Sequence, residues 1–430
     1  ILGRSIRSFI CRCSELHRCI FGPLKKSLNR SLRQQKIRAL LLISPLLIFI
    51  IAAFIMPIIS MLSRSVENDL VSQTLPETVQ ALQSWDALSG QLPGEPVYAA
   101  FAIDIKNAAK AKVHTKVGLR LNYEKSGIVS LFKKTARKAK KWDIETDGPF
   151  KEKLIDVHEG WGNIEVWQTI KTHSPIYTSG YFLNAVDMRK TVQGAEFQPE
   201  DKTILIKLFK RTFVMSLVIT FSCILLGYPV AWLLANLPMR QANFLMILVL
   251  LPFWTSLLVR TSAWKVMLQQ QGVINDVLVQ LSLVADDARL IMINNEIGTI
   301  VAMTHILLPF MILPMYSVMQ TIPPSYLRAA KSLGATNWTA FWRVYFPQSV
   351  PGIGAGSILV FILAIGYYIT PEIVGGTKGV FISNRIAYHI LKSLNWGLAA
   401  ALGTILLVAV LVLYWTYDKI VGIDNVKLGG

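Results

Sequence analysis

A carboxylate and two aromatic side chains stand close together in the stretch YYITPE, at Tyr367, Tyr368 and Glu372. A carboxylate pairs with an ammonium group, and the face of an aromatic ring attracts a cation. These residues therefore form a candidate cation site where a long apolar run ends. A plainer alternative stays open, because interfacial tyrosines commonly act as anchors and Glu372 can simply cap a turn.

A second polar and aromatic group, Trp254, Thr255 and Ser256, interrupts another apolar run. In the middle of a hydrophobic segment such residues can line a path for a solute instead of facing lipid. Packing within a helix bundle is the alternative for Trp254. We expect His305 to be a packed or hydrogen-bonded side chain, and Arg260 to extend towards the membrane surface.

The motifs of common catalytic sites are absent from the sequence. It contains no G-x-x-x-x-G-K-[ST] loop, no nucleophile elbow, no H-E-x-x-H and no paired C-x-x-C. Cys11, Cys13 and Cys19 form a cluster with His17 as the one candidate fourth ligand, but the spacing favours free thiols in a reducing cytosol. We therefore expect no catalytic site, no metal and no cofactor in this chain.

The stretch PPSYLRAAKSLGATNWTAFWRVYFP, residues 323–347, has a pattern suited to contact with another protein. Its two leading prolines favour a helix start, and Gly334 suits the left-handed residue that closes a helix. One face of this helix would carry Tyr326, Ala329, Ala330 and Leu333. The small residues would let a partner approach the backbone closely.

A second short helix is predicted over Trp338–Phe346, with Asn337 as its cap and Pro347 as its end. The alternative for the whole stretch is an ordinary connection between two helices.

The composition is that of a membrane protein. Hydrophobic residues make up 53% of the 430 residues, charged residues only 16%, and the mean hydropathy is +0.45. The net charge of +18 is uneven, since residues 1–39 hold ten basic residues and one acidic residue. Residues 64–208 are nearly balanced, with twenty basic and eighteen acidic residues. The excess indicates a cytoplasmic arm beside a membrane rather than a nucleic-acid-binding surface.

Six apolar runs are long enough to cross a membrane. They are Leu41–Ser63, Thr212–Leu237, Ala242–Trp264, Ile297–Gln320, Pro351–Ile369 and Trp396–Tyr417. Because basic residues gather on the inner side of a membrane, we expect both termini in the cytoplasm. The predicted fold class is an all-α polytopic membrane protein with six transmembrane helices.

A polar segment, residues 64–208, separates the first run from the second. Its mixed charges and short apolar stretches predict a mostly helical α+β domain with its own core, which must be periplasmic after one crossing. We expect its aromatic residues to anchor a contact with another protein or with the outer mouth of the spans. They are Trp161, Trp167, Tyr177 and Tyr181. The basic stretch at 133–141 is interpreted as a solvated helix face, because no aromatic residues interleave it.

The 323–347 stretch resembles the cytoplasmic loop of ABC-importer membrane subunits. That family carries Glu-Ala-Ala, three residues, Gly, nine residues and then Ile-x-Leu-Pro. The positions that match are Ala329, Ala330, Gly334 and Pro347. Arg328 stands in place of the acidic residue, and Val344 and Phe346 are milder departures.

Other segments sharpen the resemblance to the membrane subunits of spermidine/putrescine-type ABC importers. They are GYPVAWLLA, LPFWTSLLVR, ILLPFMILPMY and YYITPEIVGG. The resemblance covers roughly residues 209–418. The long insertion resembles an extended periplasmic domain of some relatives, and the resemblance of the core implies no role for it.

The resemblance implies the type I permease fold and a set of partners. Two membrane subunits would form the pathway for a small solute such as a polyamine. A dimer of ATPase subunits would hold ATP and Mg, and a periplasmic solute-binding protein would deliver the solute. The loop residues implied to contact the ATPase are Tyr326, Arg328, Ala329, Ala330, Leu333, Gly334 and Pro347. The pathway candidates are Trp254, Thr255, Ser256, Tyr367, Tyr368 and Glu372.

The expected organisation has five parts in an inner-membrane protein. They are a basic cytoplasmic arm (1–39), transmembrane helix 1 (40–63), a periplasmic domain (64–208), a permease core with a coupling loop at 321–350 (209–418) and a cytoplasmic tail (419–430). Three other functions stay open. They are import of another solute, such as an amino-acid derivative, an opine-like compound or an anion; a channel or secondary transporter acting alone; and a membrane-anchored interaction protein.

Overall fold

The computed structural model describes residues 31–144 and 147–421, which fall into two compact units, 1–63 and 64–430. In the first unit a helix runs from Ser31 to Ser63. It includes the π-turn η1 (Ile51–Ile55) and α2 (Met56–Ser63). Its apolar side chains are exposed, as expected for a helix whose surroundings are lipid. The helix takes in residues 31–39, which were expected in the basic arm.

The insertion is built from helices around one aromatic core. In chain order they are α3 (Asp69–Thr74), α4 (Pro76–Gln83), α5 (Glu95–Lys110), α6 (His114–Asn122), α7 (Ile128–Ala139), α8 (Phe150–Val157), η2 (Glu159–Gly162), α9 (Ile164–Thr172) and α10 (Gly180–Ala185). The strands β1 (Met188–Thr191) and β2 (Gly194–Phe197) form an antiparallel hairpin, with Met188 opposite Phe197. The expected α+β character thus rests on this hairpin in the described part.

The aromatic residues expected to be contact anchors mostly form this core. Trp161 and Trp167 are fully buried, with ring centroids 5.3 Å apart, and Phe101 packs on both. Tyr181 is also buried, whereas Tyr177 is 72% exposed. The anchor prediction was therefore wrong for the two tryptophans, because a helical domain of this size needs large side chains to fill its interior.

The membrane core consists mainly of long apolar helices. After η3 (Glu200–Lys202) come α11 (Leu205–Asn236), α12 (Met239–Leu250), η4 (Leu251–Trp254), α13 (Leu257–Met267), α14 (Val273–Gln280), η5 (Asp286–Ala288) and α15 (Glu296–Gln320). Then follow α16 (Pro324–Ser332), α17 (Asn337–Ala340), η6 (Phe341–Tyr345), α18 (Phe346–Gly366), α19 (Ile369–Val374), α20 (Ile382–Leu391) and α21 (Trp396–Val421). Among the described residues, five helices could span a membrane, or six if one bent pair counts as a span.

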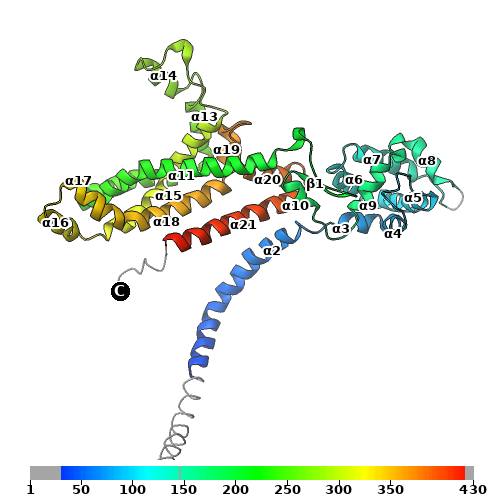
Figure 1. The fold of residues 1–430 in the computed structure, drawn as a ribbon, viewed down its shortest axis with the longest axis horizontal. Coiled ribbons are helices and arrows are strands. Elements are labelled where there is room, and N and C mark those ends of the chain that lie inside the picture. The colour runs from blue at the N-terminus through cyan, green and yellow to red at the C-terminus, as the bar shows by residue number, and fades with distance from the viewer. Residues whose placement is uncertain (1–30, 145–146, 422–430) are drawn as a thin grey trace, which may run out of the picture. The chain divides into compact units, whose positions relative to one another are not determined.

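Helices α11, α15 and α18 pack on one another around a methionine-rich core, and α21 contacts α18 (Figure 1). Glycines on α18 allow the close approach. A side-chain carbon at Gly356 would lie 2.7 Å from the sulfur of Met311, and one at Gly352 would lie 3.1 Å from the Cα of Met315. Small residues at such crossings let two membrane helices come into van der Waals contact.

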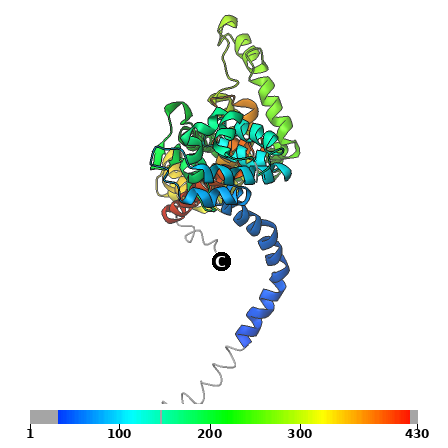
Figure 2. The ribbon, with the colours of Figure 1, turned by 90° about the vertical axis from the view of Figure 1, so that its right-hand side faces the viewer.

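The third predicted span, Ala242–Trp264, is not one continuous helix. The segments on either side of Thr255 and Ser256 meet at an angle of 95°. Both residues have extended backbone, and Pro252 lacks the N–H that would continue the helix. Beyond the break, α13 contacts α19 and α15, and α14 projects away from the bundle in both views (Figures 1 and 2).

Pro347 does not end a helix, contrary to the prediction. The helix begins at Asn337, with the side chain of Thr336 as its cap, and continues to Gly366. Just before Pro347, the N–H of Phe346 donates to the carbonyl of Phe341, five residues back. This wide π-turn moves the preceding carbonyls away from the proline ring, so the helix passes through. The same arrangement precedes Pro57, where Met56 donates to Ile51.

Candidate functional site

The predicted docking helix is present as α16 and forms one end of the bundle, together with α17 (Figure 1). The insertion lies at the opposite end of the same helices. Gly334 has φ +86°, the left-handed conformation predicted for it. Its N–H donates to Lys331, and the N–H of Ala335 donates to Ala330. This pair of bonds satisfies the last carbonyls of α16 and fixes the reversal of the chain.

The outward face of α16 agrees with the predicted docking surface in most positions. Tyr326, Arg328 and Ala329 are exposed, and Leu333 is 90% exposed, while Ala330 is half-buried. Leu333 and Tyr326 thus expose apolar surface at this corner, where a partner protein could contact it. Arg328 makes no ion pair within the described part of the chain.

Two of the predicted pathway residues line one cavity of about 1190 Å³. Tyr368, the residue before α19, and Glu372 on α19 line this cavity. Asn384 and Arg385 line it from α20. The start of α11 supplies Arg211. This cavity lies at the end of the bundle that carries the insertion, since its wall includes η3, which leads out of the insertion.

Glu372 is held in place by Asn384. The Nδ2 of Asn384 donates to Oε2 of Glu372 at 2.7 Å and to the carbonyl of Tyr368 at 2.8 Å. Its Oδ1 accepts from the N–H of Phe381 at 3.0 Å. One amide therefore ties α19 to α20 and orients the carboxylate. Sequence reasoning missed Asn384, because nothing in its local sequence indicates that it faces a residue twelve positions earlier.

The cavity carries charges of both signs. Acidic and basic residues line it together, namely Glu200, Asp201, Glu372, Lys207, Arg211, Arg385 and Lys392. Arg211 also lies 3.6 Å from Glu296, and Arg385 stacks over the ring of Tyr388 at 4.9 Å. The site can therefore hold a polar or charged solute, with Glu372 as its oriented carboxylate.

The remaining pathway candidates lie elsewhere. Trp254, Thr255 and Ser256 form the break between η4 and α13, where Trp254 is 76% exposed and the hydroxyl of Thr255 donates to Pro252. Tyr367 packs against the membrane core. The structure thus brings Tyr368 and Glu372 together and does not join Trp254, Thr255 or Ser256 to their cavity.

His305 has a hydrogen-bond partner, as expected. Its Nδ1 accepts from the indole N–H of Trp264 at 3.0 Å. Within residues 31–144 and 147–421 no group of three or more side chains is placed to hold a metal ion. The candidate metal cluster of Cys11, Cys13, Cys19 and His17 lies outside the described residues.

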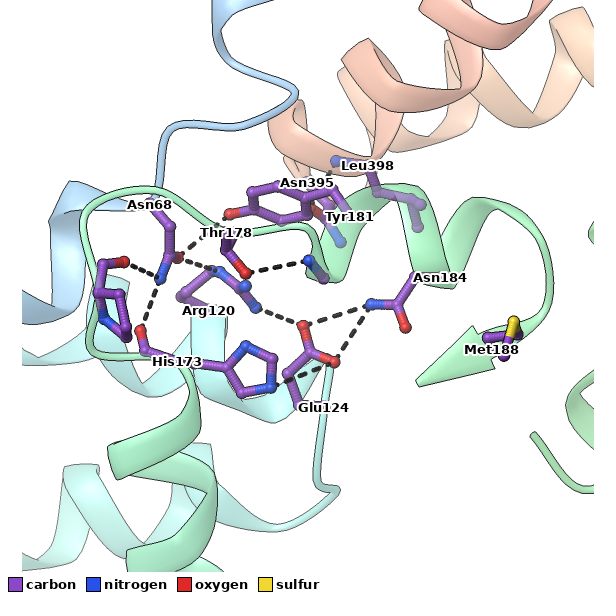
Figure 3. Close-up of polar contacts among 12 residues, drawn as sticks. Asn68, Arg120, Glu124, His173, Thr178, Tyr181, Asn184, Met188, Asn395 and Leu398 are labelled. Carbon is purple, nitrogen blue, oxygen red and sulfur yellow. Dashed lines mark hydrogen bonds and ion pairs between the residues drawn. The ribbon is translucent and has the colours of Figure 1, made fainter. Parts of the chain in front are cut away.

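A buried polar cluster joins the insertion to the start of α21 (Figure 3). Arg120 donates through Nη1 to Glu124 at 2.7 Å and through Nε to Asn68 at 2.8 Å. Asn184 donates to the same carboxylate at 3.1 Å. The ring of Tyr181 lies against the guanidinium of Arg120, 4.5 Å from its centroid. The charges are thus matched within the protein interior, as burial requires.

The other side of Tyr181 rests on the start of α21. A side-chain carbon at Gly397 would lie 2.3 Å from Cζ of Tyr181, so only glycine fits there. The hydroxyl of Tyr123 donates to the carbonyl of Ser393, and Asn395 caps α21 by accepting from Leu398 at 3.2 Å. The insertion is therefore packed directly on the sixth predicted span.

The titration of this cluster follows from its burial. Burial would raise the pKa of Glu124, but His173, Arg120 and the hydrogen bonds from Arg120 and Asn184 leave it below its ordinary value. Burial lowers the pKa of His173 to about 4, although Glu124 opposes this. The imidazole is therefore neutral at pH 7. Its contact of 3.8 Å with Glu124 is not an ion pair there, and Arg120 balances the carboxylate.

A sequence profile of one protein family matches residues 204–421, about half of the chain. Its description is "Binding-protein-dependent transport system inner membrane component". The chain belongs to this family. It is accordingly a multi-pass transport subunit of the inner membrane, and the resemblance seen in the loop and the four apolar segments is confirmed.

Relatives within the family share about a third of their residues with the matched part. Over 209 residues the chain is 36% identical to the spermidine/putrescine transport system permease protein PotB of Haemophilus influenzae, covering 48% of this chain and 72% of the relative. The same-named protein of Escherichia coli is 34% identical over 209 residues, covering 48% and 75%.

Among solved structures, a bacterial alginate ABC transporter in complex with an alginate pentasaccharide-bound periplasmic protein matches with a TM-score of 0.42. The sequence identity is 20%, over 53% of this chain and 81% of that one. The family profile begins at residue 204, so the insertion lies outside the part that defines this inner-membrane transport family.

We expect acidification to destabilise the insertion through His173. Its folded pKa is depressed, so the unfolded chain binds more protons between pH 6.5 and about 4, and folding loses on the order of 2–3 kcal/mol across that range. The stabilisation that Glu124 contributes to the folded state is lost only at lower pH, as the pH falls through its depressed folded pKa. Thermal unfolding of the solubilised chain at a series of pH values measures both.

A His173→Gln variant should lose a large part of the pH dependence above pH 4.5, and the remainder should come from His389, whose pKa burial also lowers to about 4. His114→Gln is the matched control, because His114 begins α6 and is not part of the cluster. If the wild type and His173→Gln lost stability in parallel between pH 6.5 and 4.5, the assignment of this loss to His173 would be contradicted.

Proposed function

We propose that this chain is the membrane-spanning permease subunit of an ATP-driven importer that carries a polyamine, such as spermidine or putrescine, across the inner membrane. The observation that carries the proposal is the similarity of the matched core to two permease proteins named for spermidine and putrescine transport. The oriented Glu372 carboxylate supports it, because it can pair with an ammonium group of the solute.

The partners follow from the same proposal. A dimer of ATPase subunits would supply ATP hydrolysis with Mg, a second permease subunit would complete the path, and a periplasmic solute-binding protein would deliver the solute. The fixed corner of α16 and its exposed Leu333 support a contact with an ATPase. Because Arg328 replaces the family's acidic residue, the ATPase cleft here would present a carboxylate to it.

We place both termini in the cytoplasm, residues 64–208 in the periplasm, and the bent α12–α13 pair as one of six spans. The insertion and α16 lie at opposite ends of one helical bundle, which supports their location on opposite sides of the membrane (Figure 1). The basic residues near the inner connections support the same orientation.

An anionic solute is the second candidate. The cavity beside Glu372 also contains Arg211, Arg385, Lys207 and Lys392, which would attract a negative group. Uptake into proteoliposomes of labelled spermidine and of a labelled dicarboxylate, each in competition with the other, distinguishes the two candidates.

The first prediction concerns the α16 corner. Gly334→Val should uncouple the ATPase, because a β-branched residue at φ +86° costs roughly 1–2 kcal/mol and opens the corner. Leu333→Asp should weaken the contact without affecting folding, since Leu333 touches little of its own chain. Both should reduce the copurified ATPase about tenfold or more while the spans remain inserted.

Gly334→Asn serves as the control for the corner, because asparagine tolerates the left-handed conformation. It should retain most of the ATPase. Normal ATPase copurification and normal solute-stimulated hydrolysis in both Gly334→Val and Leu333→Asp would show that α16 is not the coupling element.

The second prediction concerns the solute. Glu372→Gln keeps an oxygen that accepts from Asn384 but removes the charge, so polyamine uptake should fall with the complex intact. A lost charge-assisted contact of about 1.5–3 kcal/mol corresponds to roughly a 10- to 150-fold loss. Asp287→Asn is the control, because Asp287 is exposed and does not line the cavity. Unchanged uptake by Glu372→Gln in proteoliposomes would remove Glu372 from the pathway.

The third prediction concerns orientation. In a background without the four cysteines, Lys140→Cys on the insertion should react with a membrane-impermeant thiol reagent added to intact spheroplasts. Ser332→Cys on α16 should react only after permeabilisation. Labelling of both positions from the same side would refute the proposed topology.

A further inference from the structure

One face of α7 in the insertion carries only positive charge. Lys133, Lys134, Arg137 and Lys138 are exposed, and Lys140 and Lys141 extend the exposed basic set beyond the helix end. The opposite face is buried in the core of the insertion. Its residues are Ile128, Leu131, Phe132, Thr135, Ala136 and Ala139. The basic residues are exposed on one helix face, as predicted, and that face carries charge of one sign only.

These cations are not paired with acids in any ion pair found among the described residues. None of the ion pairs found there includes any of the six basic residues. The insertion as a whole is nearly balanced, with twenty basic and eighteen acidic residues in 64–208, so the concentration on α7 is local.

The arrangement is unfavourable for the isolated helix. Lys133 and Arg137 stand four residues apart, as do Lys134 and Lys138, and like charges at this spacing repel. The helix dipole compensates only in the last turn, which holds Arg137 and Lys138. A surface that keeps repelling charges side by side becomes favourable when an acidic partner covers it.

The position of α7 restricts what that partner can be. It packs on α5, α6 and α8, whereas contact with the sixth span is made by α10 and Tyr123. Figure 1 shows α10 between α21 and the part of the insertion that holds α7 and α8. A second copy of this chain is a poor complement, because its net charge is +18. The exposed face of α7 contains no aromatic residue on which a base of a nucleic acid could stack.

We infer that α7 is the docking surface for the acidic rim of the solute-binding protein, an inference that rests on the proposed function. A protein that carries a cationic solute needs carboxylates around its cleft, and that acidic rim is complementary to the basic face of α7. The contact speeds and strengthens docking and takes no part in moving the solute. The basic face of α7, and not the buried tryptophans predicted for this role, is thus the surface by which the insertion contacts its partner.

The test uses the assembled transporter in nanodiscs and the polyamine-loaded solute-binding protein that stimulates its ATP hydrolysis. The variant changes Lys133→Gln, Lys134→Gln, Arg137→Gln and Lys138→Gln together. Glutamine is a good helix former, and all four side chains are exposed, so α7 should remain folded. The control changes Lys133→Arg, Lys134→Arg and Lys138→Arg, which keeps every charge.

At about 50 mM salt, the concentration of binding protein giving half-maximal stimulation should rise about tenfold or more in the glutamine variant. The maximal stimulated rate should stay within about twofold of the wild type, and the arginine control should match the wild type. At about 500 mM salt the difference should disappear, because salt screens the contact.

An unchanged half-maximal concentration in the glutamine variant would overturn the inference and leave the proposed function standing. Loss of the maximal rate with an unchanged half-maximal concentration would also overturn it, since α7 would then act on coupling. Absence of stimulation in the wild-type complex would refute the proposed function itself. Binding of α7 to vesicles of anionic phosphatidylglycerol, with docking unaffected by the four changes, would assign the surface to lipid and overturn the protein partner.

Discussion

The close packing of α15 against α18 holds the membrane core together. Within lipid there is little hydrophobic gain in bringing two helices together, so contact depends on dispersion forces between closely fitted surfaces. Gly352 and Gly356 allow this fit, because they bring the backbone of α18 against Met311 and Met315. Both helices then support the corner formed by α16 and α17 at one end and the α19–α20 region at the other. Neither the docking corner nor the cavity would keep its geometry if these two helices separated.

Sequence reasoning recovered the elements whose determinants are local. The span Glu296–Gln320 was found almost to the residue, because an uncharged run between polar segments is sufficient to define it. The left-handed Gly334 was predicted for the same reason, since only the preceding helix and the absence of a side chain matter. The basic face of α7 was likewise readable from the spacing of its charges.

The features that could not be predicted from the sequence depend on hydrogen-bond geometry or on contacts between distant elements. Pro347 was read as a stop because the π-turn before it has no signal in residue types. The 95° break near Thr255 was not predicted, because Thr255 and Ser256 interrupt the apolar run without indicating how far the helix axis turns there. The pairing of Glu372 with Asn384, and of Tyr181 with Gly397, needs helices that are brought together only by the fold. Trp161 was misjudged because its type suits both a core and an interface.

The continuity of the helix through Pro347 has a mechanical consequence. From Asn337 to Gly366 the chain forms a single rod of 30 residues, roughly 45 Å long. Its Asn337 end contacts α16 through η6, and its Gly366 end leads directly into Tyr367, Tyr368 and the α19 segment that bears Glu372. No non-helical residue interrupts this segment, so one continuous helix joins the α16 corner to the segment that bears Glu372. The π-turn at Phe341–Tyr345 also shifts which face of the helix follows it. The aromatic section before Pro347 therefore contacts α16 and α17, whereas the glycine-bearing section after it contacts α11 and α15.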